Sequence, residues 1–210
     1  MERKIIAIID YGAGNLRSVI NAFEAIGQRP FVTDKPAELA KAAAIVLPGF
    51  GAFGDGMRNL RQRGWVEALN EEVRVKGKPY LGICLGLQFL ARTSLERGIH
   101  EGLNWIDSEV VEIEPNGSGF RVPHIGWNEV RFERASPIFD NLEDGPVFYF
   151  VHSYYLRMDS SDREAVTATC WHGVTITAAV QKENLFGVQF HPEKSQRSGL
   201  SVLRNFAQMI

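Results

Sequence analysis

The 210-residue sequence contains only two cysteines, Cys84 and Cys170, and no apolar run approaches the roughly 20 residues that a membrane-spanning helix needs. Two cysteines do not suggest a disulfide framework, so we expect a protein of the reducing cytoplasm. Residues 1–4 lead straight into a strand-like run, without the apolar region and small-residue cleavage site of a secretory signal. We therefore expect neither export nor a membrane as a partner.

The sequence also lacks an imbalance of charge. Its 23 basic and 25 acidic side chains give a formal net charge of -2 and form no block of one sign. Such a balance gives no reason to expect nucleic acid or an anionic surface as a partner. The chain has no internal repeat, low-complexity tract or linker either. With a hydrophobic content of 45%, typical of globular proteins, we expect one domain that covers residues 1–210.

The first half of the chain alternates between strand-like and helix-like segments. Near-continuous apolar runs at residues 4–10, 44–47 and 79–84 are typical of parallel strands covered on both faces. Between them, apolar residues recur at helical spacing, as in residues 16–26, which Gly27 follows as a C-cap. Shorter segments are a strand near residues 31–32, an alanine-rich helix before residue 44, and helical patterns at residues 57–63 and 65–76. This alternation predicts an α/β fold with a parallel-rich central sheet flanked by helices.

The second half of the chain is richer in strands. Strand-like runs separated by Gly, Asn, Asp and Pro occur at residues 110–113, 129–132, 147–150, 165–169, 174–178 and 186–190. A final amphipathic helix covers residues 200–207. We therefore expect additional antiparallel strands in the C-terminal half, within the same domain.

Residues 79–90 change from an apolar strand to a helical pattern, and Cys84 lies at the change. Gly82 and Gly86 flank the cysteine, as a sharp strand-to-helix turn requires where the backbone doubles back. A thiol at this place sits at a helix N-terminus, where the macrodipole and free N–H groups favour the nucleophilic thiolate. Residue type alone favours a buried core cysteine, but the glycine spacing and the change from strand to helix favour a nucleophile.

A cysteine nucleophile needs a base, and usually a third group that orients the base. Of the five histidines, His191 follows the strongly apolar run 186–190, at the kind of strand end where active sites of parallel sheets gather. Glu193 lies two residues further on, so its carboxylate can reach the imidazole edge that does not face the thiol. A single histidine is more often structural, but its pairing with Cys84 favours a triad of Cys84, His191 and Glu193.

Several stretches of the sequence resemble the class I glutamine amidotransferases. Residues 82–88 are similar to the nucleophile motif of that family, residues 189–193 to its His/Glu motif and residues 48–51 to its oxyanion loop. Phe50 departs from the pattern, because a smaller aliphatic residue is expected there. Residues 10–16, 122–128, 149–154 and 191–195 resemble the branch of the family that works with a separate cyclase subunit. The resemblance covers essentially the whole chain and implies the flavodoxin-like fold of these enzymes.

The resemblance also implies a reaction and the role of each member of the triad. Cys84 would attack the side-chain amide carbon of L-glutamine, and His191 would carry the proton to the departing ammonia. Glu193 would fix the tautomer of the imidazole and stabilise the imidazolium. Water would then hydrolyse the glutamyl thioester, so that the chain acts as a glutaminase with a cysteine nucleophile.

The tetrahedral oxyanion of such a reaction needs two preorganised donors, each commonly worth about 2.7–4 kcal/mol on deletion. One candidate is the backbone N–H of Leu85, the residue that follows the nucleophile of the turn. The second should come from Phe50 or Gly51, because glycine lets the backbone approach a substrate closely. By resemblance, the residues that hold glutamine are Gly51, Gln88, Ser153 and Tyr154.

Hydrolysis of glutamine alone would waste ammonia, and the sequence shows no second catalytic constellation. The resemblance implies a heterodimer with a (β/α)8-barrel cyclase subunit, to which ammonia is channelled. The products would be imidazole glycerol phosphate and aminoimidazole-carboxamide ribonucleotide, in histidine biosynthesis. The residues expected on the docking face are Asn15, Trp127, Tyr149 and Lys194. An ordinary solvated surface is the simpler interpretation of Asn15 and Lys194.

Other functions remain open from the sequence. A paralogous class I amidotransferase that supplies another synthase, as in nucleotide-sugar amidination, would have the same triad. A γ-glutamyl hydrolase or a cysteine peptidase shares thiolate acyl transfer, and a binding module would need no catalysis. Gly49, Gly51 and Gly54 match a dinucleotide-binding glycine pattern, but Pro48 leads the loop and the preceding strand is not the first of the chain. Without C-x-x-C or H-x-x-x-H spacing for zinc, we expect neither a metal nor a cofactor.

Overall fold

The computed structural model describes residues 5–210; Lys4, at which the first predicted strand begins, lies outside the described residues. Within this range a sheet of nine strands forms the centre of the molecule, in the order β2-β1-β3-β4-β13-β12-β11-β8-β9. Its strands are β1 (Ile6–Ile9), β2 (Phe31–Thr33), β3 (Ala44–Gly49), β4 (Tyr80–Cys84), β8 (His124–Phe132), β9 (Val147–His152), β11 (Val166–Trp171), β12 (Thr175–Lys182) and β13 (Leu185–Val188).

The central sheet is parallel on one side and antiparallel on the other. Strands β2, β1, β3, β4 and β13 run parallel to one another. Strands β12, β11, β8 and β9 continue the sheet in antiparallel pairs. Every residue of β1, β3, β4 and β13 is buried, because both faces of this part of the sheet are covered. The predicted parallel-rich centre with antiparallel strands from the second half is therefore confirmed.

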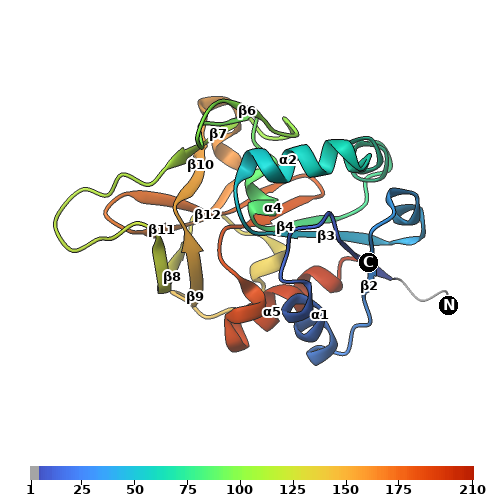
Figure 1. Ribbon diagram of the computed structural model, residues 1–210. Helices are drawn as coiled ribbons and strands as arrows, with labels where there is room; N and C mark the ends of the chain where they lie inside the picture. The colour runs from blue at the N-terminus through green and yellow to red at the C-terminus, as the bar shows by residue number, and fades with distance from the viewer. Residues whose placement is uncertain (1–4) are drawn as a thin grey trace.

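Helices cover the two faces of the parallel strands (Figure 1). The α-helices are α1 (Leu16–Ala25), α2 (Phe53–Gln62), α3 (Trp65–Leu69), α4 (Leu85–Gln88) and α5 (Gln196–Ala207). Shorter elements are the 3-10 helices η1 (Pro36–Lys41), η3 (Pro137–Phe139), η4 (Ser160–Ala165) and η5 (Pro192–Lys194), and the π-helix η2 (Asn70–Val75). In β1, Ile6 and Ile8 pack in one core with α1 and α5, whereas Ala7 and Ile9 pack in a second core with α2 and α3. Two apolar layers thus hold the sheet in place.

Three predicted helices differ in the structure. The alanine-rich segment forms the 3-10 helix η1, and the pattern over residues 65–76 changes from α3 to the wider π-turns of η2 after Leu69. The helical pattern expected up to residue 90 forms a helix that ends at Gln88. Beyond that point the carbonyls of Phe89, Leu90 and Ala91 accept N–H groups from the loop of residues 103–106. Tertiary hydrogen bonds thus replace the next turn of helix. The predicted C-cap is confirmed, since Gly27 has a φ of +81° and donates its N–H to Glu24.

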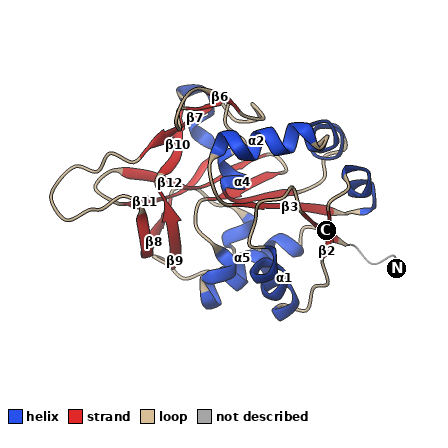
Figure 2. Cartoon of the chain, in the orientation of Figure 1, coloured by secondary structure: helices blue, strands red, loops and turns tan. Residues whose placement is uncertain are grey.

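A second sheet in the order β10-β7-β5-β6 packs beside the first (Figure 2). Its strands are β5 (Thr93–Ser94), β6 (His100–Glu101), β7 (Ser108–Glu112) and β10 (Tyr154–Met158). Of these only β7 was predicted, because β5 and β6 have two residues each and β10 directly follows β9 in the chain. Across residues 5–210, no helix combines the length and the apolar content needed to cross a bilayer.

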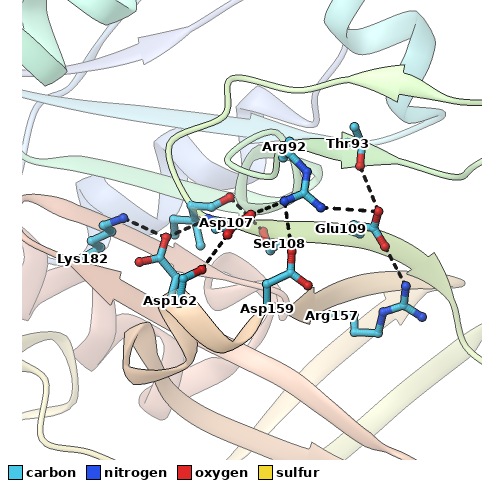
Figure 3. A network of polar contacts seen from close by, with 11 residues as sticks. Arg92, Thr93, Asp107, Ser108, Glu109, Arg157, Asp159, Asp162 and Lys182 are labelled. Carbon is cyan, nitrogen blue, oxygen red and sulfur yellow. Dashed lines mark hydrogen bonds and ion pairs between the residues drawn. The ribbon is translucent and has the colours of Figure 1, made fainter.

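A polar network joins the two sheets (Figure 3). Asp162 of η4 accepts the backbone N–H of Asp107 at 2.7 Å and the ammonium of Lys182 from the central sheet at 2.7 Å. Arg92 pairs with Asp107 and with Asp159, the latter at 3.1 Å. Burial disfavours the charged form of Asp162, but these hydrogen bonds outweigh it and hold the pKa of its carboxyl below the usual value. The network thus ties η4, β7 and β12 together through charged groups.

Candidate active site

Cys84 lies at the sharp turn between β4 and α4, with φ +53° and ψ -107°. A positive φ is strained for a residue that carries a Cβ, and such strain is common at functional sites. A Cβ on Gly82 would stand 2.4 Å from the carbonyl oxygen of Gly86, and a Cβ on Gly86 would stand 1.8 Å from that of Leu47. The flanking glycines are therefore required by close backbone packing. Because α4 is a single turn, its macrodipole is smaller than the predicted longer helix would provide.

Two neighbouring parallel strands bring other site residues to Cys84. In the register of β3 and β4, Gly49 is the partner of Cys84, so the loop that follows β3 begins beside the nucleophile. On the other side Val188 of β13 pairs with Ile83, and His191 follows three residues later. The carboxyl ends of three parallel strands thus meet at one place, which is where ligands bind in open α/β sheets.

His191 and Glu193 form a buried pair. Nδ1 of His191 lies 2.8 Å from Oε1 of Glu193, and the Glu193 side chain is only 2% exposed. Burial disfavours the imidazolium, but the thiol of Cys84 and the carboxylate of Glu193 outweigh it and raise the pKa of His191 to about 10. Since Nδ1 is bound to the carboxylate, Nε2 is the nitrogen left to exchange a proton with the thiol. At neutral pH the histidine is therefore protonated and suited to stabilise a thiolate.

A cavity of about 500 Å³ opens in front of these groups. It is lined by Cys84, His191 and Glu193, and also by Phe50, Gly51, Leu85, Gln88, Ser153 and Tyr154. The structure thus brings the predicted triad, oxyanion residues and glutamine-binding residues to one cavity. The side chain of Phe50, which departs from the family pattern, is 55% exposed. A larger residue is therefore accommodated there without entering the core.

The side-chain Nε2 of Gln88 makes two hydrogen bonds within the protein. Its Nε2 donates to the backbone oxygen of Tyr154 at 2.9 Å and to Oε1 of Gln189 at 3.1 Å. Gln189 in turn donates from Nε2 to the sulfur of Cys84 at 3.6 Å. The buried Gln189 was part of a recognised motif, but nothing in its sequence position indicated a contact with the nucleophile. Gln88 and Gln189 therefore connect the wall of the cavity to the thiol.

The residues predicted for the docking face lie around the cavity and beside it. Trp127 and Tyr149 are cross-strand partners in β8 and β9, with ring centroids 5.9 Å apart. The ammonium of Lys194 lies 5.8 Å from the Tyr149 ring centroid, and Trp127 is 49% exposed. Asn15 and Lys194 line the cavity, whereas Trp127 and Tyr149 do not. Lys194 thus connects this aromatic pair to the cavity.

Three charged residues of the cavity wall were not predicted. Glu96 and Arg97 follow β5, Glu112 ends β7, and all three line the cavity. Oε2 of Glu96 accepts the backbone N–H of Phe53 at 2.7 Å, at the start of α2. Glutamine, the expected substrate, has an α-ammonium and an α-carboxylate group. Neighbouring residues of opposite charge, such as Glu96 and Arg97, were therefore the signal that could have identified this wall. No motif marked these positions, because the residues come together only through the pairing of β5 with β7 in the second sheet.

Comparison with known families places this geometry in a class. Residues 7–209 match the family described as Glutamine amidotransferase class-I. The chain belongs to this family. Solved structures agree in fold: PurLQS from Thermotoga maritima aligns with a TM-score of 0.73 over 99% of both chains at 20% identity. A glutamine amidotransferase from the same organism reaches 0.69, over 100% of this chain and 98% of that chain, at 17% identity.

Curated relatives narrow the class further. "Imidazole glycerol phosphate synthase subunit HisH" of Geobacter sulfurreducens is 49% identical over 208 residues, 97% of this chain and 98% of that protein. The same subunit of Moorella thermoacetica is 49% identical over 205 residues, 98% of this chain and 95% of that protein. Subunit HisH 2 of Pseudomonas aeruginosa is 41% identical over 206 residues, 98% of this chain and 100% of that protein. Within the class I amidotransferases, the chain thus falls among the HisH subunits.

Proposed function

We propose that the protein is the glutaminase subunit of imidazole glycerol phosphate synthase, which hydrolyses L-glutamine to glutamate and ammonia. The observation that carries this proposal is the buried pair of His191 and Glu193 beside Cys84, at the wall of one cavity. The near-full-length identity of 49% to HisH subunits supports the choice of this synthase over a paralogous amidotransferase. It equally disfavours a peptidase, a γ-glutamyl hydrolase or a non-catalytic module.

The raised pKa of His191 suits this imidazole to take the proton of the Cys84 thiol and to hold it for the leaving group. Sγ of Cys84 attacks the side-chain amide carbon of glutamine, and the C–N bond breaks as His191 donates its Nε2 proton to the leaving ammonia. Water then attacks the thioester, gives its proton to the now neutral His191 and releases glutamate and the thiolate. Glu193 holds Nδ1–H throughout, so Nε2 always faces the reacting atoms.

The oxyanion of each tetrahedral intermediate would be held by backbone N–H groups at two places. Leu85 offers the first, directly after the nucleophile, and Phe50 or Gly51 offers the second. The pairing of Gly49 with Cys84 supports this assignment, because it sets the loop beside the sulfur. A φ of +96° at Gly51 gives the loop a conformation that side-chain-bearing residues rarely adopt.

Recognition of glutamine would use both ends of the substrate. Gln88, Ser153 and Tyr154 line the same cavity as the triad and would hold the substrate near the thiol. The carboxylate of Glu96 and the guanidinium of Arg97 supply charges complementary to the α-ammonium and α-carboxylate groups. Replacing Glu96 by Gln should therefore raise the KM for glutamine more than it lowers kcat.

Ammonia would pass to a (β/α)8-barrel cyclase subunit bound as the second half of a heterodimer. Trp127 and the half-buried Tyr149 would supply the aromatic surface of this docking face, and Asn15 and Lys194 line the cavity beside it. Aromatic residues that are partly exposed in a free subunit are typical anchors of protein interfaces. In the proposed complex, ammonia yields imidazole glycerol phosphate and aminoimidazole-carboxamide ribonucleotide for histidine biosynthesis.

We also propose that residues 1–210 form one domain that works in the cytoplasm. The family match over residues 7–209 supports a single unit. The free thiols of Cys84 and Cys170 are of the kind that a reducing compartment maintains.

The proposed function is tested by glutamate production with and without the purified cyclase and its nucleotide substrate. We expect the complete mixture to turn over glutamine faster than the chain alone, and Trp127→Ala to reduce that stimulation. Val75→Ala is the matched control, since Val75 is 73% exposed and precedes β4, at the end opposite Cys84. Equal turnover with and without the cyclase would overturn the pairing. The gene should also restore growth of a histidine auxotroph that lacks this subunit, whereas a paralogue that supplies another synthase would not.

A further inference from the structure

A chain of side-chain hydrogen bonds crosses from β8 to the wall of the substrate cavity. Nδ2 of Asn128 lies 3.1 Å from Nε2 of His124, and Nδ1 of His124 lies 3.0 Å from Nε2 of His152. Nδ1 of His152 then lies 2.9 Å from the backbone oxygen of Tyr154. That oxygen is the one that Gln88 also binds, and His152 itself lines the cavity. The chain therefore ends on the residues that face the substrate.

The direction of every bond in this chain is fixed from both ends. At the cavity, the carbonyl of Tyr154 can only accept, so Nδ1 of His152 carries a proton. At the other end, Nδ2 of Asn128 donates to the backbone oxygen of Trp171 at 2.9 Å, which fixes the orientation of the amide. The second N–H of the same amide is then left to donate to Nε2 of His124. Nε2 of His124 must therefore be unprotonated. His124 then donates from Nδ1, and His152 accepts at Nε2, so the two ends require the same arrangement.

The packing around the two imidazoles maintains this arrangement. His124 and His152 are direct cross-strand partners in β8 and β9, which places their side chains on one face. His124 is stacked between Phe150 and His172, with ring centroids at 4.7 and 4.1 Å. Midway between His124 and Asn128 the strand has Gly126, which puts no side chain between the imidazole and the amide. Both rings are thus held in a fixed orientation.

Protonation of either imidazole would place two N–H groups against each other, so the chain requires both to be neutral. Burial, helped by the neighbouring His172, lowers the pKa of His124 to about 4. Burial is also the main cause that lowers the pKa of His152 to about 3. At neutral pH both rings are therefore uncharged. This leaves His191 as the charged imidazole of the cavity.

Resting on the proposed glutaminase function, we propose that His124 and His152 are positioning residues that hold the Tyr154 carbonyl, and through it Gln88, in the geometry that binds glutamine. The hydrogen-bond chain also gives the docking face a physical connection to the cavity, because Asn128 is adjacent to Trp127 in β8. The side-chain hydrogen bonds of Cys84 and His191 go to Gln189 and Glu193 rather than to either of these histidines. Their effect is therefore on substrate binding rather than on the chemical step.

The first test is spectroscopic and needs no activity. Two-bond ¹H–¹⁵N correlation spectra of protein labelled with ¹⁵N at histidine report which ring nitrogen carries the proton, and the signals are assigned by their loss in single variants. At pH 7.5 we expect His124 and His152 to be neutral and both protonated at Nδ1. An Nε2–H tautomer or an imidazolium at either position would overturn the proposal. Failure of the proposed enzymatic function would leave this result unchanged.

The second test compares KM and kcat for glutamine without a partner subunit. His124→Phe keeps the aromatic stack but removes both hydrogen bonds, so we expect KM to rise about tenfold while kcat stays within about threefold. His124→Asn retains a donor near the position of Nδ1 and should stay within about threefold of the wild-type KM. An unchanged KM in His124→Phe, or equal damage in both variants, would show that packing rather than hydrogen bonding matters.

A surface control and a reversal at the Asn128 end of the hydrogen-bond chain complete the set. Asn128→Asp replaces the donor to His124 by an acceptor, which favours the reverse direction for the hydrogen bonds between residues 128 and 154. We expect this variant to raise KM as His124→Phe does. Glu129→Gln changes the next residue of β8, which is exposed and outside the chain, and should leave KM unchanged. A normal KM in Asn128→Asp would contradict the fixed direction of the chain.

Discussion

The carbonyl oxygen of Leu47 occupies the space that a side chain on Gly86 would need, since a Cβ at that position would lie 1.8 Å from it. Real Cβ atoms do not approach an oxygen so closely. The backbone of β3 and the first turn after Cys84 are therefore in direct contact. This contact holds the strained turn that carries the Cys84 thiol, and it links the loop after β3 to that turn.

We predict that Gly86→Ala lowers the free energy of unfolding by roughly 3 kcal/mol, because the added methyl group must push β3 and α4 apart. Glutaminase activity of the folded fraction should fall as well, since the same shift moves Leu85. The measurement is urea unfolding together with turnover. Gly14→Ala is the control: its Cβ would meet the end of the flexible Leu16 side chain at 3.2 Å. Equal stability of Gly86→Ala and wild type would refute the steric argument.

Replacing Glu193 by Gln removes the charge that holds the His191 imidazolium but keeps an acceptor for Nδ1. We predict a loss of kcat/KM on the order of 10² to 10⁴, with the pKa of His191 moving down. Steady-state kinetics over a range of pH provide the measurement. Glu114→Gln removes an exposed carboxylate from the loop after β7 and should have no effect. A Glu193→Gln enzyme with normal kinetics would mean that the pair does not orient the proton carrier.

The raised pKa of His191 makes a prediction for stability against pH. In the unfolded chain a histidine titrates near 6.5, whereas in the folded protein His191 titrates near 10. Its contribution to stability is therefore fully present below about pH 6.5 and is lost as the pH rises through about 10. The difference in unfolding free energy between wild type and His191→Gln should shrink over this window, as denaturant titrations would measure. A difference that grows with pH would contradict the raised value.

For Asp162 we predict the opposite dependence of stability on pH, at acid pH. Because its pKa is lowered in the folded state, its contribution is present above the unfolded value near 3.8 and is lost as the pH falls below it. At pH 7 we predict that Asp162→Asn costs about 1–3 kcal/mol, since the partly buried Lys182 loses its partner. Asp159→Asn, whose side chain is 39% exposed in its pair with Arg92, should cost about 0–1 kcal/mol. Thermal unfolding of both variants at pH 7 and pH 3.5 would check this order.

The predictable parts of the structure were those encoded by short, local patterns. The turn at Cys84 was visible because two glycines are needed within two residues of it, and the buried strands because their apolar runs are continuous. The position of His191 also followed from a local rule, since it ends such a strand. In each case the residues that determine the structure are close together in the sequence.

What the sequence did not reveal depends on contacts between distant segments. The helix after Cys84 ends early because residues 103–106 take the carbonyls of its next turn. Strands β5 and β6 have no pattern of their own and exist through their pairing partners. His124 and His152 meet only in the register of β8 and β9. Periodicity and motif spacing contain none of this information.

The central claim is that Cys84 is the nucleophile of a glutaminase, and one measurement tests it most directly. Ammonia and glutamate released from L-glutamine should be measured for wild type, Cys84→Ala and Cys170→Ala in the presence of the cyclase subunit. Burial raises the pKa of the Cys170 thiol to about 12, so this variant should remain active. The account predicts equal amounts of the two products from wild type and none above background from a folded Cys84→Ala variant. Turnover retained by Cys84→Ala would contradict it.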